Sequence, residues 1–424
     1  MFGNITLQSL SLQSYSQTSL FTEPANYLRN YLFFNKISYF RSFSPFFSSF
    51  SSNSQLKFAN SRFNTILNSV ISINDKRFNH TRYNTGLREK PDEDLEILYC
   101  TFTDITSKKE GGAICLKSYR YSLFTYCCGF SLCASHTSGG AIYLNCYSYL
   151  AYKTCFYGCL ALNSDQAIHS DVRKYARDEA ADNTFNLTFI CQCSPKQSQG
   201  QKRAVFLTGG MQIFLNSNFT NNHVREESSA MITSYPTIFN LKFCEFTKSS
   251  GTNLIWIHLI EDGFTLSYCN IYNNTLAVNK SSSVVVIEQS RAVFTRFIFF
   301  DNQCFHCMEG TYQVFLIECS FDFQFEQAIF GELKVSDKGS KFMTAGRKYK
   351  LKFAPTWDCW AIGSASPRAT SILIHILNPQ NSSTSLIIII LVIIVGGIVG
   401  FAIWFSRKTF IRDLEDLEPI NIEN

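Results

Sequence analysis

The chain has 424 residues, of which 46% are hydrophobic and 17% charged, and its formal net charge is +5. The basic residues are spread without a long Lys/Arg run, which excludes the basic patch typical of nucleic-acid binding, so we expect no nucleic-acid partner. The length would fit two or three ordinary domains, but one repetitive solenoid can also fill it.

The N-terminal segment, residues 1–37, is rich in Ser, Gln and Leu. It lacks a charged start followed by an apolar run of about 7 to 15 residues, so no secretory signal is visible. Two accounts fit a surface protein: the sequence begins inside a longer gene product, or the chain is inserted through a C-terminal segment. We expect the first, because residues that resemble early coils stand near the start.

Residues 38–94 contain these early coils and a polar loop. Ser38 with Phe40, and Ser61 with Phe63, match the repeat weakly. The stretch Lys76–Asp94 is the most polar before the strong repeats, and we expect it to project as a loop.

The strong repeats begin with Cys100–Ile114, which returns without a gap at Cys128–Ile142. Ten of the 22 residues from Cys100 to Tyr121 reappear 28 positions later. All but one of the repeats open with Cys or Ser, followed two residues later by an aromatic or apolar residue, and most intervals are 25 to 28 residues. The openings across residues 95–330 are Cys100, Cys128, Cys155, Cys191, Ser217, Cys244, Cys269, Phe297 and Cys319. This period indicates a solenoid.

The pattern inside each unit predicts strands. The apolar runs are four to six residues long and β-branched or aromatic, as in AICL at Ala113 and AIYL at Ala141, and no unit carries a helical period. A leucine-rich-repeat frame is also absent. We therefore predict an all-β protein, a parallel β-helix of about nine to eleven coils.

Stacking of coils explains the residue types in the repeat. Equivalent side chains lie about 4.8 Å apart, so inward positions favour residues that stack on themselves. We expect the seven opening cysteines to form a buried thiol ladder, and Asn222, Asn274, Asn302 and, more loosely, Gln324 to form an amide ladder. The Gly pair before Ala113 and Ala141 fits a turn that needs a positive φ.

The repeat resembles a known family. GGAI at Gly111 and Gly139, together with Phe-x-x-Asn at Phe219 and Phe299, is similar to the repeat of polymorphic outer membrane proteins (Pmp), which is also abundant in surface proteins of parasitic protists. The resemblance covers roughly Leu95 to Phe330. It implies a right-handed β-helix and an adhesive role at the cell surface.

The sixteen cysteines and the insertion Asp171–Asp182 offer two further candidates for function. An even cysteine count in an exported protein is compatible with disulfides. Cys304 with Cys307, and Cys191 with Cys193, resemble redox or metal pairs, but neither has a second pair at zinc spacing, so we expect a structural or disulfide use. The charged insertion is expected to be a solvated loop or short helical turn rather than a binding site.

We expect no catalytic, cofactor or metal site. Carbohydrate-cleaving β-helices need carboxylates from adjacent coils on one face with Arg or Lys beside them. The in-phase positions read Lys117, Asn145 and Asp171 and then diverge, while His136 and His169 look isolated. A polysaccharide lyase or hydrolase is the alternative to a non-catalytic function.

The C-terminal part changes character. Residues 331–385, with Trp357, Cys359 and Trp360, are expected to form a cap and a short stalk. Leu386–Phe405 is 20 residues without a charge, enough to span a membrane as a helix, and Arg407, Lys408 and Arg412 follow it. The positive-inside rule then places the tail, residues 406–424, in the cytoplasm and the β-helix outside, as in a single-pass type I protein of the plasma membrane. Gly396 and Gly400 would permit a weak homodimer through this helix.

Sequons agree with this orientation. One occurs at Asn4, and six are candidate glycosylation sites on the expected outer side: Asn79, Asn186, Asn218, Asn273, Asn279 and Asn381. The function expected from the sequence is adhesion, or recognition of host or neighbouring glycans or proteins. A structural surface coat and an intracellular membrane scaffold are the remaining alternatives.

Overall fold

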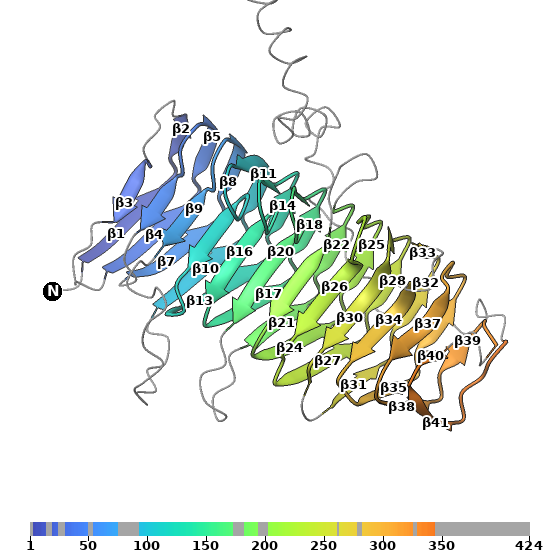
Figure 1. The fold of residues 1–424 in the computed structure, drawn as a ribbon. Helices are drawn as coiled ribbons and strands as arrows, with labels where there is room; N and C mark the ends of the chain where they lie inside the picture. The colour runs from blue at the N-terminus through green and yellow to red at the C-terminus, as the bar shows by residue number, and fades with distance from the viewer. Residues whose placement is uncertain are drawn as a thin grey trace, which may run out of the picture. The chain divides into compact units, whose positions relative to one another are not determined.

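Three parallel β-sheets form the wall of a solenoid in the computed structural model (Figure 1). The structure describes residues 3–13, 19–23, 30–49, 54–74, 93–172, 182–193, 202–260, 263–277, 282–324 and 329–343. All of them lie in one compact unit, Met1–Thr370. The chain visits the sheets in the order A, B, C, and each strand pairs with its equivalents in the coils before and after it.

Among the described residues, sheet A has 13 strands. They are β1 (Gly3–Gln8), β4 (Asn30–Asn35), β7 (Ser54–Ala59), β10 (Glu93–Leu98), β13 (Tyr121–Tyr126), β17 (Ser148–Tyr152), β21 (Asp182–Asn186), β24 (Met211–Leu215), β27 (Ile238–Lys242), β31 (Phe264–Ser267), β35 (Ala292–Thr295), β38 (Gln313–Ile317) and β41 (Lys334–Lys338).

Sheet B has 14 strands in the described part of the chain, two of which lie beside its main path. The main path is β2 (Ser11–Gln13), β5 (Ser38–Ser42), β8 (Arg62–Ile66), β11 (Thr101–Ser107), β14 (Gly129–Ser131), β18 (Cys155–Tyr157), β22 (Phe189–Cys191), β25 (Asn218–Thr220), β28 (Glu245–Thr247), β32 (Asn270–Tyr272), β36 (Ile298–Phe300) and β39 (Ser320–Phe321). The side strands are β15 (Ala134–Ser135) and β19 (Leu160–Ala161).

Within the ranges that the structure describes, sheet C has 12 strands. They are β3 (Phe21–Glu23), β6 (Phe47–Ser49), β9 (Ile71–Asn74), β12 (Ile114–Lys117), β16 (Ile142–Cys146), β20 (Ile168–Val172), β23 (Val205–Thr208), β26 (Ser228–Ser234), β30 (Asn253–His258), β34 (Ser283–Glu288), β37 (His306–Gly310) and β40 (Ile329–Gly331). A two-stranded pair, β29 (Ser250–Gly251) and β33 (Thr275–Leu276), lies between sheets B and C in the sequence.

The predicted parallel β-solenoid is thus confirmed, in its right-handed form. The nine coils located from Cys100 onward occupy β10 to β40, and β1 to β9 continue the same three sheets on the N-terminal side. Three early strands lie within residues 3–23, inside the segment that the sequence left without coils. The described residues contain strands and turns but no helix.

A phenylalanine column on the inner face of sheet B holds successive coils in register. Phe102, Phe130 and Phe156 stack with ring centroids 4.8 and 5.0 Å apart and nearly parallel planes. The column continues to Phe321, which stacks on Phe342 at 4.9 Å. Rings in this arrangement gain area burial plus a further contribution of about 1 kcal/mol per pair.

The corner between sheets A and B is made by one residue in the left-handed conformation. In the coils of the strong repeats this residue stands directly before the inward opening position. The residues are Tyr99, Cys127, Lys153, Leu187, Asn216, Phe243, Tyr268, Arg296 and Glu318, with φ between 48° and 57°. This corner could not be predicted from the sequence, because hardly any of these residue types favours a positive φ.

Two of the predicted openings are wrong, one by one residue and the other by three. Phe130 pairs with Phe156, which makes Thr154 rather than Cys155 the opening residue of its coil. Phe156 pairs in turn with Ile190, so the next coil opens at Thr188 rather than Cys191. Successive side chains of a strand alternate between its two faces, so a shift by an odd number of residues moves a side chain to the opposite face. Cys155 and Cys191 therefore point outward.

The opening predicted for the early coil at Ser38 is also wrong, by one residue. Tyr39 pairs with Phe63 and is fully buried, so this coil opens at Ile37 and not at Ser38. The opening at Ser61 is confirmed, because Phe63 pairs with Phe102.

The cysteine ladder is confirmed only in part. Cys100, Cys128, Cys244, Cys269 and Cys319 are buried, free thiols in the opening column. A second run of thiols, which the sequence did not predict, stands five residues further on at Cys133, Cys159 and Cys193. Burial raises the pKa of the Cys100 thiol to about 12, so this thiol is neutral and packs as a small apolar group.

The amide ladder is confirmed at three of its four members. The Asn274 side chain accepts from the backbone N–H of Ser249 at 3.0 Å and donates to Asn302 Oδ1 at 2.9 Å. Asn222 accepts from the backbone N–H of Cys193 at 3.0 Å. Gln324 is exposed and does not belong to the ladder.

Candidate functional site

The outer face of sheet C carries a column of rings, formed by Tyr143 on β16, His169 on β20 and Phe206 on β23. The rings of Tyr143 and His169 lie 4.5 Å apart with planes 4° from parallel, and His169 lies 5.3 Å from Phe206. Because the faces of the rings meet each other, their edges are the parts that point away from the sheet. The His169 side chain is 16% exposed.

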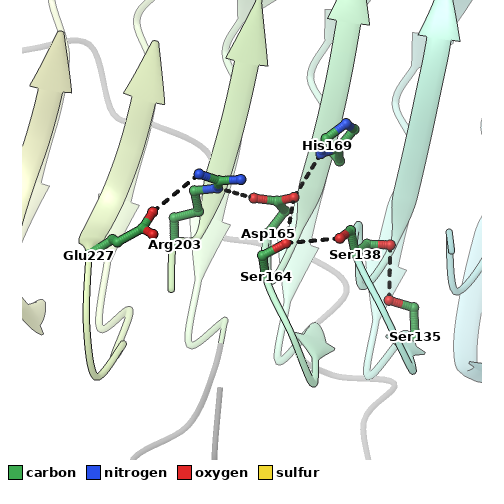
Figure 2. Close-up of polar contacts among 7 residues, drawn as sticks. All are labelled: Ser135, Ser138, Ser164, Asp165, His169, Arg203 and Glu227. Atoms are coloured by element: carbon green, nitrogen blue, oxygen red, sulfur yellow. Dashed lines mark hydrogen bonds and ion pairs between the residues drawn. The ribbon is translucent and has the colours of Figure 1, made fainter. Parts of the chain in front are cut away.

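Asp165 lies in the turn before β20 and links this column to the next coil (Figure 2). Its carboxylate is fully buried, with Oδ2 2.7 Å from His169 Nδ1 and 3.0 Å from Ser164 Oγ. Oδ1 accepts from Nε of Arg203. The backbone of Asp165 has φ 59°, an uncommon conformation for a residue other than glycine.

The surroundings of Asp165 favour its charged form. Burial alone would raise the pKa of this carboxyl. The hydrogen bond and charge of His169, with the charge and hydrogen bond of Arg203, outweigh burial and lower the pKa below its usual value. Asp165 is therefore an anion that orients His169 through Nδ1.

Arg203 connects Asp165 to the following coil. Its Nη1 lies 3.1 Å from Glu227 Oε2, and its guanidinium lies 3.9 Å from the centre of the Phe206 ring. Lys202 approaches the other oxygen of Glu227 at 3.6 Å. Figure 2 shows Arg203 between the two carboxylates, so the network ties neighbouring coils together at the entry to sheet C.

A polar column runs beside the rings. Lys117, Asn145, Asp171 and Thr208 are paired one to the next across β12, β16, β20 and β23, which confirms that the first three are in phase. Lys117 Nζ lies 3.1 Å from Glu110, and the Tyr119 hydroxyl donates to Asp171 at 2.8 Å. Burial would raise the pKa of Glu110, but its backbone hydrogen bond and Lys117 lower it.

The expectation that His169 is isolated is wrong. Asp165 and His169 are four residues apart, and the turn between them brings the carboxylate onto the ring. One signal was available in the sequence: SGGAI at Ser138 becomes SDQAI at Ser164, so a carboxylate stands where the repeat has glycine. Arg203 and Glu227 could not have been found this way, because they lie at different offsets within their coils.

The candidate glycosylation sites differ in exposure. Asn273 is exposed, with φ 55°, in the turn after β32. Asn186 and Asn218 are half-buried in β21 and β25, and Asn186 accepts a hydrogen bond from Asn216 at 3.3 Å. Asn79, Asn279 and Asn381 lie outside the described residues.

The described ranges contain neither a metal-binding group of side chains nor a membrane-spanning helix. No group of three or more His, Cys, Asp or Glu side chains there is arranged to hold a metal ion, and Cys191, Cys193, Cys304 and Cys307 are free thiols. No helix long and apolar enough to cross a membrane was found in that part of the chain. The predicted span Leu386–Phe405 with Gly396 and Gly400, the cap residues and most of both polar insertions lie outside it.

Comparison with models of known protein families, with curated proteins and with solved structures found no match.

Proposed function

We propose that this protein is a single-pass protein of the cell surface whose solenoid recognises an extended glycan of a host or neighbouring cell and does not cleave it. The apolar segment Leu386–Phe405 and the basic residues after it supply the membrane anchor in this proposal, with the tail in the cytoplasm. The likeness of the repeat to polymorphic outer membrane proteins agrees with such a role.

The observation that carries the proposal is the pair of columns on sheet C. Ring edges and polar groups recur once per coil, at a rise of about 4.8 Å, so a ligand with repeating hydroxyl groups meets a repeated set of partners. His169, Asn145 and Lys117 offer both donors and acceptors along this strip. Their partial burial holds them in place before a ligand arrives.

Catalytic cleavage of the glycan is the second candidate, and one observation favours it. Asp165, Glu227 and Arg203 bring two carboxylates and a guanidinium from adjacent coils together, as such enzymes require. A general acid, however, needs a raised pKa, whereas the pKa values of Asp165 and Glu110 are lowered. Asp171 and Glu227 are also each engaged by a neighbouring side chain. This chemistry supports binding over cleavage.

The first test is topology. The chain carries a C-terminal tag, intact cells are treated with protease, and the lysate is treated with an enzyme that removes N-glycans. We expect the protease to cleave the solenoid and to leave the tag intact. The apparent mass of the chain on a gel should fall on deglycosylation. A protected, unglycosylated solenoid would instead indicate an intracellular scaffold.

The second test is a glycan array probed with the full chain in detergent. Lys117→Ala should abolish binding, whereas Lys57→Ala should leave it unchanged. Lys57 is a matched control, since it is 29% exposed and pairs with Glu96 at 2.7 Å on sheet A, while Lys117 is 30% exposed. Equal binding by both variants would contradict the sheet C site. New reducing ends or unsaturated sugars from a uronic-acid polymer would favour the enzyme, and lateral self-assembly without glycan binding would favour a coat.

A further inference from the structure

The two columns on the outer face of sheet C continue beyond the candidate site. The ring column passes from Phe206 through Ile232 to Trp256 on β30. Beside it, the polar column passes through Ser234 to His258, which is two residues further along the same strand. Because side chains alternate between the two faces of a strand, Trp256 and His258 both lie on the outer face. The two columns therefore reach at least as far as β30.

His258 forms a second pair of a histidine with a carboxylate. Its Nδ1 lies 2.8 Å from Glu288 Oε2 in the next coil, and the two side chains are 30% and 37% exposed. Tyr235 follows directly after β26, is 58% exposed and meets the His258 ring at 5.7 Å with planes 88° apart. Three coils, or about 14 Å, separate this group from His169. Unlike Asp165, which is fully buried, Glu288 is open to a ligand.

The charge at this end of sheet C is negative. The side chains of β30, β34 and β37 that reach solvent are Trp256, His258, Glu288 and Glu309. Glu309 is half-buried and accepts from Ser283 Oγ at 2.7 Å. Among the described residues no Lys or Arg forms an ion pair with Glu288 or Glu309, in contrast to Glu110 and Glu227. Two carboxylates here are thus without a cation.

Trp256 brings a further ring and an unused donor. Val286 separates it from Glu309 along the column. Its Nε1 is buried without a hydrogen-bond partner, which costs free energy until an acceptor reaches it. A sugar hydroxyl is such an acceptor, and rings with carboxylates beside them attract protonated amines. Together these groups suit a ligand that carries both hydroxyl groups and an amine.

We infer that Tyr235, Trp256, His258, Glu288 and Glu309 form a second subsite on sheet C, and that this subsite takes an amino sugar with a free, protonated amine. Glu288 and Glu309 supply the charge that the amine needs, and Tyr235 supplies a ring against which the sugar packs. A lysine-rich peptide offers the same amine. The sugar also supplies hydroxyl oxygens for Trp256, and it continues the columns along which the glycan is proposed to lie, so in this respect the inference rests on the proposed function.

A short ligand separates this subsite from the rest of the strip. Glu288 lies six coils beyond Lys117, counted through Asn145, Asp171, Thr208, Ser234 and His258. Six steps of about 4.8 Å make a distance of about 29 Å. A trisaccharide of glucosamine is too short to touch both ends, so its binding tests the second subsite whether or not Lys117 binds a glycan.

The experiment measures binding of this trisaccharide to the full chain in detergent by isothermal titration calorimetry. We expect Glu288→Gln to weaken binding about tenfold or more, because it removes a charge, and Tyr235→Ala to weaken it several-fold. Glu96→Gln is the matched control, since Glu96 on sheet A is 38% exposed and pairs with Lys57. This control and Lys117→Ala should both leave the affinity for the trisaccharide unchanged.

The results that would overturn the inference are distinct. No binding of the trisaccharide, or equal binding by the original chain and Glu288→Gln, would exclude the subsite. Equal affinity for the N-acetylated trisaccharide would show that the amine is not recognised. Tighter binding of a lysine-rich peptide, lost in Glu288→Gln, would assign the site to a basic protein segment. If Glu288→Gln weakens the trisaccharide but Lys117→Ala does not change the glycan array, the second subsite stands and the site around Lys117 falls.

Discussion

Two neighbouring coils enter sheet C through different turns. One uses Gly139 and Gly140, and the next uses Asp165 and Gln166 at the equivalent positions. An added Cβ on Gly139 would lie 2.3 Å from the backbone oxygen of Ile142, so the first turn has room only for glycine. The second turn carries real side chains in these places and must therefore be wider.

Both side chains of the second turn make polar contacts. The Asp165 carboxylate points to His169 and Arg203, while the Gln166 side chain accepts from the backbone N–H of Ala161 at 2.9 Å. A left-handed Asp costs about 1 kcal/mol or more relative to glycine, and its hydrogen bonds offset that cost. The comparison teaches that a turn which loses glycine can gain a polar network, and the candidate site stands at this point.

The largest effect is expected from Gly140→Ala. The new Cβ would lie 2.0 Å from the backbone oxygen of Gln166, which cannot move without disturbing the coil. We expect a loss of about 3 kcal/mol or more in the free energy of unfolding, measured from urea midpoints. Gly339→Ala is the control, with φ 77° but no atom within 4 Å of the new Cβ, and should cost about 1 to 2 kcal/mol. Equal losses of unfolding free energy for the two variants would show that the close contact at Gly140 is not what makes its replacement costly.

Asp165→Ala should have the next largest effect. It removes a fully buried carboxylate, leaves the ring of His169 without this partner and leaves Arg203 with Glu227 alone. We expect a loss of about 2 to 4 kcal/mol, and a smaller loss for Asp165→Asn, which keeps the shape and some hydrogen bonds. An Asp165→Ala chain as stable as the original would mean that the network contributes nothing net.

The pH dependence of the stability difference between the original chain and Asp165→Asn is a sharper test. Because the folded pKa of Asp165 is lowered, its stabilisation is complete above the unfolded pKa of about 3.9 and is lost as the pH falls through the folded pKa. The difference in unfolding free energy between the original chain and Asp165→Asn should be constant from about pH 7 to 5 and shrink below about pH 4. If the stability difference instead grew toward acid pH, the pKa of Asp165 would be raised on folding and not lowered.

The smallest effect is expected at an exposed ion pair. Arg296 Nε lies 2.6 Å from Glu318, but the two side chains are 50% and 55% exposed. Water and salt screen this pair, so Glu318→Gln should leave the urea midpoint unchanged within error. If Glu318→Gln lowered the urea midpoint as much as Asp165→Asn, burial would not explain why the Asp165 network contributes more than the exposed ion pair.

The strand period and the inward stacking were readable from the repeat. Cys100, Phe102 and Gly111 recur at constant offsets, and these positions are those that stack coil on coil. The errors at Cys155 and Cys191, of one and three residues, arose where a β-branched Thr154 or Thr188 fills the opening position. Composition alone does not show which of two adjacent residues points inward.

By itself the sequence determined that the chain repeats, that its units are β-strands, and that Lys117, Asn145 and Asp171 share one column, because self-stacking restricts the residues at each offset. Only the tertiary structure decided that Asp165, His169, Arg203 and Glu227 meet, and that Cys155 faces outward. These contacts join residues at different offsets in different coils, and their distances depend on the width of each turn, which no periodic pattern records.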